Sequence, residues 1–397
     1  MITDLRQSYN SKFTSEKYQT MLDDIAEIYG HRAPFRIAET PVFVSSALRD
    51  RIFTAIEDIT ETLIRPDFKE LSKSAVQAGQ SVPNETDHTT FLQMDFGICL
   101  DENGEMTPQL IEVQGFPSLY FYQEAAAQAY AKHFELPKGY DHLFHGQDPK
   151  SYIERLRKII VGDCDPKNVV LLEIEPKKQA TAIDFYVCRE LIDVPFICIS
   201  EVIKEDKKLF YKDESGEKIR IERIFNRVIF DELITRDDLQ RQFNMTEDAD
   251  VEWIGHPNWF FRISKHTLPL LDSQYVPKSY FLNELENYPE DLHNYVLKPL
   301  YSFAGSGVLL NINPHDLDAI KDPENYILQR KVTYAPILET PTGKAVVELR
   351  MLMLWEKDAP RPELVNNLAR ISKGEMIGVR YNKNKDWVGG SIGYFEV

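Results

Sequence analysis

The stretch that decides the fold is YVLKPLYSFAGSGVLLNI, residues 295–312. An apolar run typical of a β-strand leads to Lys298, then a loop of small residues contains Gly305, Ser306 and Gly307, and a second β-type run follows. Backbone N–H groups in such a loop form a concave anion cradle, because no side chain blocks the approach of phosphate oxygens. A lysine before the loop adds positive charge. The stretch predicts either a phosphate site between two strands or a plain hairpin with a solvated lysine.

The order of residues in this stretch excludes the P-loop. That motif places its lysine after the glycines and runs into a helix, whereas here Lys298 precedes the glycines and a β-type run follows them. The chain also lacks H-E-x-x-H, G-x-S-x-G and the dinucleotide-binding glycine pattern. Zinc proteases, α/β-hydrolases and dinucleotide enzymes are therefore disfavoured.

The composition describes an acidic globular protein. The 397 residues are 43% hydrophobic and 11% aromatic, which favours two or three packed units over disorder, and the formal net charge is -17. Such a balance argues against nucleic acid or an anionic membrane as a partner. The four cysteines form no C-x-x-C pair and are expected to be reduced. Neither a signal-peptide pattern nor an apolar run of about 20 residues occurs, so we expect a cytoplasmic protein.

Hydrophobic periodicity predicts an α/β (α+β) fold. Residues 15–29 and 45–64 have helical spacing, and residues 91–118 form two β-type runs around an Asn-Gly turn signal. From 151 to 228, helical and β-type segments alternate, which favours a parallel sheet. Helical patterns are also predicted at 237–243 and 264–271. Residues 276–332 read as a small unit of helix, strand, loop, strand, short helix and strand.

The predicted hairpin at 91–118 carries a candidate cation site. Asp95 lies on its first strand, and Glu112 and Gln114 lie two residues apart on its second, a spacing that points both side chains to one face of a strand. Mg²⁺ takes oxygen ligands and commonly bridges carboxylates to nucleotide phosphates. The alternative is that these polar side chains occupy a solvated face.

Two arginines near the C-terminus are candidates for binding transferred phosphoryl. In VELRMLML, Glu348 and Arg350 share one face of a predicted strand, which would suit either a bidentate clamp on phosphate or a cross-strand salt bridge. In NNLARIS, Arg370 lies between Asn367 and Ser372. It could neutralise negative charge that develops on the transferred phosphoryl group. The alternative is that the segment is a solvated loop.

Two further features carry weaker signals. Lys265, in RISKHTLPLL, is either a second phosphate lysine or a solvated lysine on a helix. His142 and His145 have the spacing of metal ligands, but no third ligand lies nearby in the sequence, and we expect both at the surface.

Taken in order, seven segments resemble the circularly permuted ATP-grasp family, the group that includes glutathionylspermidine synthetase-like proteins. KPLYSFAGSGVLL resembles its lid loop and YILQRKV its adenine hinge, while FLQMDFG and LIEVQGFPS resemble its metal-ligand segments. ERIFNRV resembles a strand with a paired basic motif, and VELRMLML with NNLARIS resemble the phosphate-facing arginine segments. The resemblance spans about residues 90 to 397. Gln93 and Gln114 stand where the family often has Arg and Asn, and Asn226 replaces the first of two arginines.

The resemblance implies a fold and a division of the chain. The fold would be of the ATP-grasp type, circularly permuted, with a small α+β lid. The implied parts are an N-terminal helical segment plus the metal-ligand hairpin (1–150), an α/β domain (151–275), the lid (276–332) and the C-terminal part of the grasp core (333–397).

The resemblance also implies an activity, namely ATP- and Mg²⁺-dependent ligation of a carboxylate to an amine through an acyl phosphate. The implied metal ligands are Asp95, Glu112 and Gln114, and the implied catalytic residues are Arg350 and Arg370. The implied ATP-binding residues are Lys265, Lys298, Gly305, Ser306, Gly307, Gln329, Lys331 and Val332. A phosphotransferase and a non-catalytic nucleotide-binding regulator stay open as alternatives. The expected partners are small-molecule or peptide substrates, which the sequence does not name, and it leaves the oligomeric state open.

Overall fold

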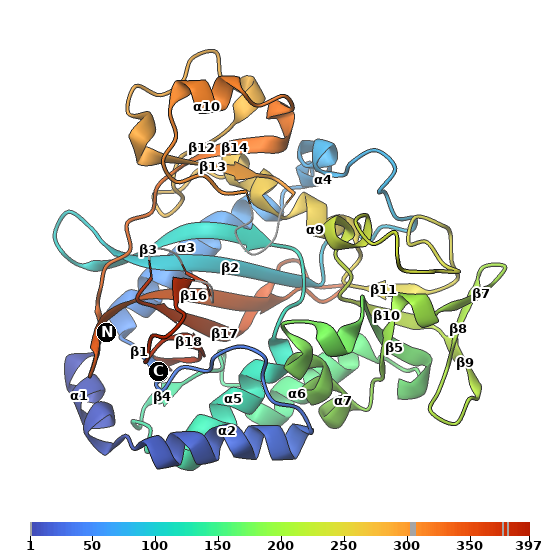
Figure 1. Ribbon diagram of the computed structural model, residues 1–397, viewed down its shortest axis with the longest axis horizontal. Coiled ribbons are helices and arrows are strands. Elements are labelled where there is room, and N and C mark those ends of the chain that lie inside the picture. The colour runs from blue at the N-terminus through green and yellow to red at the C-terminus, as the bar shows by residue number, and fades with distance from the viewer. Residues whose placement is uncertain (1, 302–306, 375–376, 379–380) are drawn as a thin grey trace.

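The computed structural model describes residues 2–301, 307–374, 377–378 and 381–397. Its centre is an antiparallel sheet with the strand order β18-β17-β16-β2-β3, and β15 pairs with β16 beside it. The strands are β2 (Phe91–Leu100), β3 (Met106–Gln114), β15 (Leu338–Thr340), β16 (Gly343–Leu354), β17 (Glu363–Ser372) and β18 (Gly389–Ser391). The predicted hairpin is thus confirmed as β2 and β3. It lies beside strands from the other end of the chain (Figure 1).

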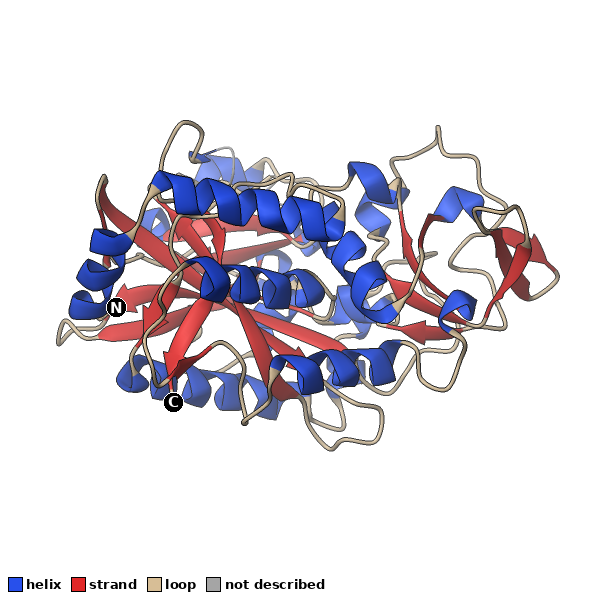
Figure 2. Cartoon of the chain, turned by 90° about the horizontal axis from the view of Figure 1, so that it is seen from below, coloured by secondary structure: helices blue, strands red, loops and turns tan. Residues whose placement is uncertain are grey.

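Helices cover both faces of this sheet (Figure 2). One face of β16, including Val347, Leu349 and Met351, packs in a core with the apolar side of α3. The other face differs along its length: Leu352 and Leu354 are buried in a second core with α5, whereas Glu348 and Arg350 lie nearer the start of β16. The sheet therefore leaves one polar region on a face that is otherwise apolar.

The helices agree largely with the predicted periodicity. They are α1 (Thr3–Lys12), α2 (Ser15–Tyr29), α3 (Ser46–Leu63), α4 (Phe68–Leu71), α5 (Tyr120–His133), α6 (Pro149–Ile160), α7 (Ala182–Ile192), α8 (Phe230–Leu233), α9 (Asn258–Arg262) and α10 (Pro314–Asp318). No helix in the described part of the chain is long and apolar enough to cross a membrane.

A parallel sheet of order β11-β10-β5-β6 confirms the predicted α/β alternation. Its strands are β5 (Val169–Glu173), β6 (Phe196–Cys198), β10 (Arg223–Asn226) and β11 (Glu252–Ile254). Two smaller sheets have three strands each. One contains β7 (Ile203–Glu205), β8 (Lys208–Lys212) and β9 (Lys218–Ile221). The other contains β1 (Val42–Val44), β19 (Gly393–Glu396) and β4 (Tyr140–Asp141).

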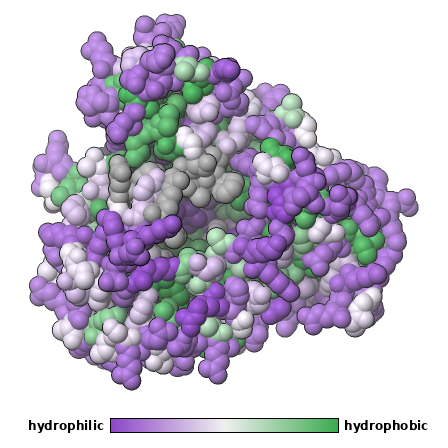
Figure 3. All heavy atoms as spheres, in the orientation of Figure 1, coloured by the Kyte–Doolittle hydropathy of each residue, from purple (hydrophilic) through white to green (hydrophobic). Residues whose placement is uncertain are grey.

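Residues 276–301 and 307–332, named the lid segment after the prediction, form the upper part of the molecule in Figure 1, and several of them share an apolar cluster. The antiparallel sheet of the lid segment has the order β12-β14-β13, with β12 (Ser279–Phe281), β13 (Tyr295–Pro299) and β14 (Tyr326–Arg330). The predicted short helix is confirmed as α10, and the Asn313 side chain at its start accepts hydrogen bonds from the N–H groups of His315 and Asp316. In the orientation of Figure 1, the surface is mostly hydrophilic, as the net charge predicts (Figure 3).

Three local predictions were wrong, and the helical pattern predicted at 264–271 is confirmed only as a 3₁₀ helix. Residues 237–243 form turns and bends, since Arg236 pairs with Glu175 and Asp238 and a segment this short has little helical stability of its own. Residues 265–270 form a 3₁₀ helix, with Pro269 inside it. The predicted helix at the start of the 276–332 unit is replaced by β12 and two short 3₁₀ helices, Leu282–Glu284 and Leu292–Asn294. After Gly307 the described residues contain one isolated bridge, Leu297 to Leu309, in place of a strand. The four predicted chain divisions stay predictions.

Candidate functional site

Strand register collects five charged side chains on one region of the central sheet. Asp95 on β2 lies opposite Glu112 on β3 and opposite Arg350 on β16. Glu348 on β16 lies opposite Arg370 on β17. Residues directly opposite one another in antiparallel strands point to the same face. The register therefore brings acids from near residue 100 against arginines from near residue 360.

A continuous ion-pair network joins these side chains. Arg350 makes two hydrogen bonds to Asp95, from Nε to Oδ1 at 2.6 Å and from Nη2 to Oδ2 at 2.7 Å. The Nη2 atom of Arg370 contacts both Oδ2 of Asp95 and Oε1 of Glu348. Tyr334 donates its hydroxyl to the second oxygen of Glu348 at 2.6 Å. Asp95 and Glu348 are 1% and 2% exposed, and buried carboxylates of this kind are stable only when charges and hydrogen bonds compensate them.

The two buried carboxylates respond differently to this network. Burial by itself would raise the pKa of Asp95, but Arg350 and Arg370 outweigh it and hold that pKa below its usual value. Burial raises the pKa of Glu348, although Arg370 acts in the opposite direction. Asp95 is therefore the firmly ionised member, to which both arginines are anchored.

Glu112 and Gln114 lie at the edge of the network, and both are half-buried. Gln114 donates from Nε2 to Oε1 of Glu112 at 2.6 Å, and the Nη2 atom of Arg350 lies 3.7 Å from the same oxygen. The predicted shared face of these two residues is thus seen directly. A carboxylate and an amide so placed are chemically suited to a hard cation, with the amide turned to present its oxygen.

The predicted metal triad fits Mg²⁺ only in part. Both oxygens of Asp95 are already hydrogen-bonded to arginine. Among the described residues, no group of three His, Cys, Asp or Glu side chains is arranged to hold a metal ion. Glu112 with Gln114 is therefore the part of the predicted triad that could take a cation in this arrangement.

Two lysines approach Glu112 from other elements. Lys298 on β13 donates from Nζ to the carbonyl oxygen of Ile111 at 3.3 Å, so the lid sheet touches the acidic hairpin. Burial lowers the pKa of Lys298 to about 8, while Glu112 acts to raise it. Burial also lowers the pKa of Lys265, which Glu112 and Asp231 partly oppose. These lysines, more than 100 residues from Glu112 in sequence, share one acidic neighbour.

The loop after Lys298 is described at its two ends, residues 299–301 and Gly307. Gly305 and Ser306 lie outside the described residues. Gly307 has φ +73°, a conformation that favours glycine, and a Cβ there would lie 3.0 Å from Cγ of Pro299. The end of the loop therefore returns close to the residue that follows Lys298.

The three predicted hinge residues lie in two environments. Gln329 is 1% exposed, within the lid sheet. Lys331 and Val332 line a cavity of about 310 Å³ between the lid connection and the hairpin. Its other lining residues are Cys99, Leu100, Asp101, Thr107, Gln109, Gln274, Tyr275 and Thr333. The cavity thus includes Lys331 and Val332 but not Gln329.

Other sequence expectations need correction. The segment around Arg370 is the strand β17. Asn367 has a structural role, because its side chain donates hydrogen bonds to the carbonyl oxygens of His142 and Gly393 at 3.0 Å each. Ser372 hydrogen-bonds with Asn382 at 3.1 Å. His142 was expected at the surface but is buried, with Nε2 2.8 Å from a carboxylate oxygen of Glu124. His145 is exposed, as expected.

Sequence reasoning missed Tyr334 as a member of the site. It lies in a connecting segment without strand or helix, where no periodicity marks a buried hydroxyl. Glu348 was placed on the correct face beside Arg350, but its bond to Arg370 could not be found without the pairing of β16 with β17.

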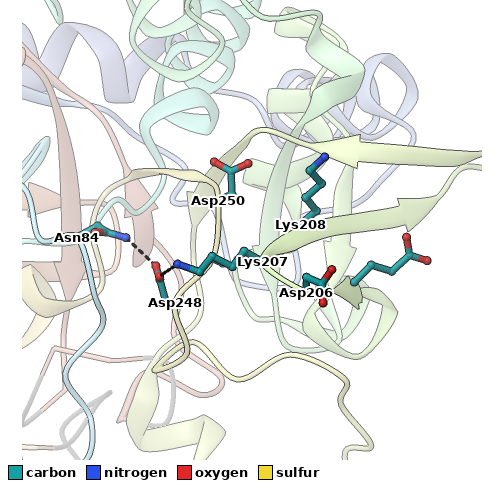
Figure 4. Close-up of a pocket in the computed structure, with 8 residues that line it drawn as sticks. Asn84, Asp206, Lys207, Lys208, Asp248 and Asp250 are labelled. Carbon is teal, nitrogen blue, oxygen red and sulfur yellow. Dashed lines mark hydrogen bonds and ion pairs between the residues drawn. The ribbon is translucent and has the colours of Figure 1, made fainter.

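A larger hollow, of about 510 Å³, lies away from this network (Figure 4). Its lining mixes both charges, and Lys207 is paired with Asp248 at 2.5 Å, while Asn84 donates to the same carboxylate at 3.2 Å. Carboxylates outnumber lysines in this lining, and Glu205 and Asp250 pair with Lys218 and Arg220 outside it, so the hollow does not present the positive charge that a phosphate site needs.

Comparisons with known proteins give a likeness of fold. No family model and no curated protein matches the chain. The solved glutathione synthetase-like effector (GSS30) from Globodera pallida, in its apo form, matches with a TM-score of 0.57 and 10% identity over 97% of this chain and 98% of that one. A protein of Methylobacillus flagellatus KT, provisionally named gamma-glutamylcysteine synthetase, matches at TM-score 0.33 and 12% identity over 85% and 86%, which is too weak to argue from. The chain thus shares a mixed α/β fold with that effector.

Proposed function

We propose that this protein is an ATP- and Mg²⁺-dependent ligase that joins a carboxylate to an amine through an acyl phosphate. The observation that carries the proposal is the contact of Lys298 with Ile111, beside Glu112. It places the lid strand, the acidic hairpin and the arginine network next to one another. The fold shared with a glutathione synthetase-like protein supports the same reading.

Each group of residues has a proposed task in binding. Lys298 and Lys265 supply positive charge to the phosphates, with Gly305, Ser306 and Gly307 as the anion cradle. The cavity lined by Lys331 and Val332 receives the adenine base of ATP. Gln329, in the lid sheet, stabilises the bound adenine. Glu112 and Gln114 would hold Mg²⁺, which when bound neutralises phosphate charge.

The arginines have unequal proposed tasks. A substrate carboxylate oxygen attacks the γ-phosphorus and ADP leaves, and then an amine attacks the acyl carbon and phosphate leaves. Arg370 is the better candidate to meet the transferred phosphoryl, because its side chain is 32% exposed while that of Arg350 is 10% exposed. Arg350, bound to Asp95 at two points, holds the network in place. The lid would exclude water from the reactive acyl phosphate.

One observation favours a second candidate, a nucleotide-binding protein without catalysis. The two oxygens of Asp95 are engaged by arginines, which removes one predicted metal ligand. Under this alternative the network would stabilise the fold and the cavity would bind nucleotide without turnover.

Release of ADP separates these candidates. Purified protein is incubated with MgATP and pools of amino acids, polyamines and short peptides that supply carboxylates and amines. ADP release that needs an amine supports the ligase. Release without any amine indicates transfer to another acceptor, and binding of ATP without release supports the non-catalytic alternative. Absence of ATP binding contradicts both.

A further inference from the structure

The segment 331–337, which connects the lid strand β14 to the central sheet, is attached to the sheet at two adjacent residues. Tyr334 donates its hydroxyl to Oε2 of Glu348 on β16 at 2.6 Å. The N–H of Ala335 donates to the carbonyl oxygen of Ile98 on β2 at 2.9 Å. The connecting segment is thus bound to a buried carboxylate by a side chain and to an inner strand by its backbone.

A glycine makes this approach feasible. Gly97 on β2 lies opposite Glu348, and a Cβ at that position would lie 2.7 Å from Cε1 of the Tyr334 ring. The ring therefore lies directly over Gly97, and any side chain there would push it away from Glu348.

Glu348 relays the position of Tyr334 to an arginine. One oxygen of this carboxylate accepts from Tyr334 and the other contacts Arg370, which also contacts Asp95. Glu348 is 2% exposed, so water cannot replace either partner freely. The orientation of the carboxylate, and with it that of Arg370, depends on the hydrogen bond from Tyr334 and on the ion pair with Arg370.

The other end of the same segment lies at the candidate base cavity. Lys331, Val332 and Thr333 line that cavity, and Thr333 is the residue directly before Tyr334. The N–H of Lys331 also donates to the carbonyl oxygen of Asn294 at 2.7 Å, which ties this end to the lid. A ligand that moves residues 331–333 must move the backbone on which Tyr334 is mounted.

We propose that Tyr334 is a positioning residue that couples occupation of the cavity at Lys331 and Val332 to the orientation of Arg370. The inference rests on the proposed function for the identity of the ligand, a nucleotide. It assigns no contact between Tyr334 and substrate, since the hydroxyl acts through Glu348.

The nuclear magnetic resonance of arginine side chains tests this coupling. Protein labelled with ¹⁵N-arginine is compared as wild type, Tyr334→Phe and Tyr288→Phe, and the Arg370 Nε–H signal is assigned with Arg370→Lys. Tyr288 is the matched control, because its hydroxyl also donates to a carboxylate, Asp318 at 2.9 Å, but on the lid surface. We expect the Arg370 signal to shift in Tyr334→Phe without nucleotide and to stay in place in Tyr288→Phe. An unmoved signal in Tyr334→Phe overturns the proposal.

Adding a non-hydrolysable ATP analogue tests the link to the cavity. The analogue should shift the Arg370 signal in the wild type and shift it less in Tyr334→Phe. In the ADP-release assay, Tyr334→Phe should lower kcat about tenfold, the size expected for one hydrogen bond to a charged group, with KM for ATP within about twofold. Equal responses to the analogue in both proteins contradict the coupling. If the wild type binds no analogue, the proposed function fails, and the coupling to the cavity fails with it.

Gly97→Ala provides a second variant that keeps the hydroxyl. It should displace the Tyr334 ring and shift the Arg370 signal in the same direction as Tyr334→Phe. Circular dichroism of each variant verifies folding. A folded Gly97→Ala protein with the wild-type Arg370 signal would count against the proposed contact.

Discussion

Asp95 on β2 and Arg350 on β16 form a two-point ion pair across adjacent strands, with N–O distances of 2.6 and 2.7 Å, although 255 residues separate them in the sequence. Both partners are nearly inaccessible to water, at 1% and 8% exposure. Breaking a buried pair by removing one partner leaves the other charge uncompensated, which costs about 3–5 kcal/mol. Asp95→Asn should therefore lower the free energy of unfolding, measured with urea, by about that amount.

The exposed pair Arg65–Asp67 is the control for this prediction. Its N–O distance is 2.7 Å, but the two side chains are 52% and 53% exposed. Asp67→Asn should change the free energy of unfolding by less than about 1 kcal/mol. Similar losses in both variants would show that Asp95 contributes no more than a surface carboxylate.

Removing Glu112 should abolish turnover that depends on Mg²⁺ while the fold stays intact. Glu112 is half-buried and contacts Gln114 at 2.6 Å and Arg350 at 3.7 Å. Loss of a metal-binding carboxylate should reduce kcat about a hundredfold or more, because charge stabilisation by the metal accounts for several kcal/mol. The assay is ADP release against Mg²⁺ concentration for Glu112→Ala. Glu105→Ala, at the exposed turn of the same hairpin, is the control, and wild-type turnover in Glu112→Ala would dismiss Glu112 as a ligand.

Lys298→Met should weaken nucleotide binding. The lysine reaches the acidic hairpin from the lid strand, and its charge would meet the phosphates there. A hydrogen bond to a charged group is worth about 1.5–3 kcal/mol, so the dissociation constant of a non-hydrolysable ATP analogue should rise about tenfold or more. Calorimetry of Lys298→Met beside Lys321→Met, an exposed lid lysine, measures this. Equal affinities in the two variants would remove Lys298 from the phosphate site.

The same lysine predicts how nucleotide affinity depends on pH. Burial lowers the pKa of Lys298 to about 8 in the free protein. Below that pH the lysine is charged and ready to bind phosphate, whereas above it binding must first take up a proton. Affinity for the analogue should therefore fall as pH rises through about 8, by at most about tenfold per pH unit. Lys298→Met should lack this decline, and a wild-type affinity that stays constant from pH 7 to pH 9.5 would contradict it.

Local signals predicted much of the fold. The apolar alternation and the Asn103-Gly104 turn are both contained within residues 91–114, and the hairpin formed as expected. The apolar run after Gly307 gave a wrong strand prediction, since Leu309 is 44% exposed and is joined to Leu297 by an isolated bridge. A strand pattern predicts a strand only where something buries its apolar face.

The arrangement of the candidate site could not be predicted from local patterns, because it depends on how distant strands pair. Glu112 and Gln114 were placed on one face by their spacing alone, but the partner of Asp95 is set by the register of β2 against β16. A slip of one residue would turn Arg350 to the opposite face, and only the packing of both faces forbids it. His142 was misplaced for a similar reason, because its partner Glu124 lies on a different element.

The buried carboxyl of Glu173 predicts an unusual dependence of stability on pH. It lies at the end of β5, 5% exposed, and accepts a hydrogen bond from the N–H of Ile174 at 2.7 Å. Burial raises its pKa to about 8, although Arg227 acts in the opposite direction. The folded protein therefore keeps this proton between about pH 4.5 and pH 8, where an unfolded chain has lost it. This contribution to the free energy of unfolding is full below about pH 4.5 and declines as pH rises to about 8.

Glu173→Gln keeps the shape of the side chain and removes the titration. Relative to wild type, it should be more stable at pH 8 than at pH 5, by a difference on the order of 2–4 kcal/mol. Urea unfolding at a series of pH values measures the difference, with the exposed Glu217→Gln as the control that should follow the wild-type curve. Parallel curves for wild type and Glu173→Gln would mean that Glu173 ionises in the folded protein as readily as in the unfolded chain, and that Arg227 compensates its burial completely.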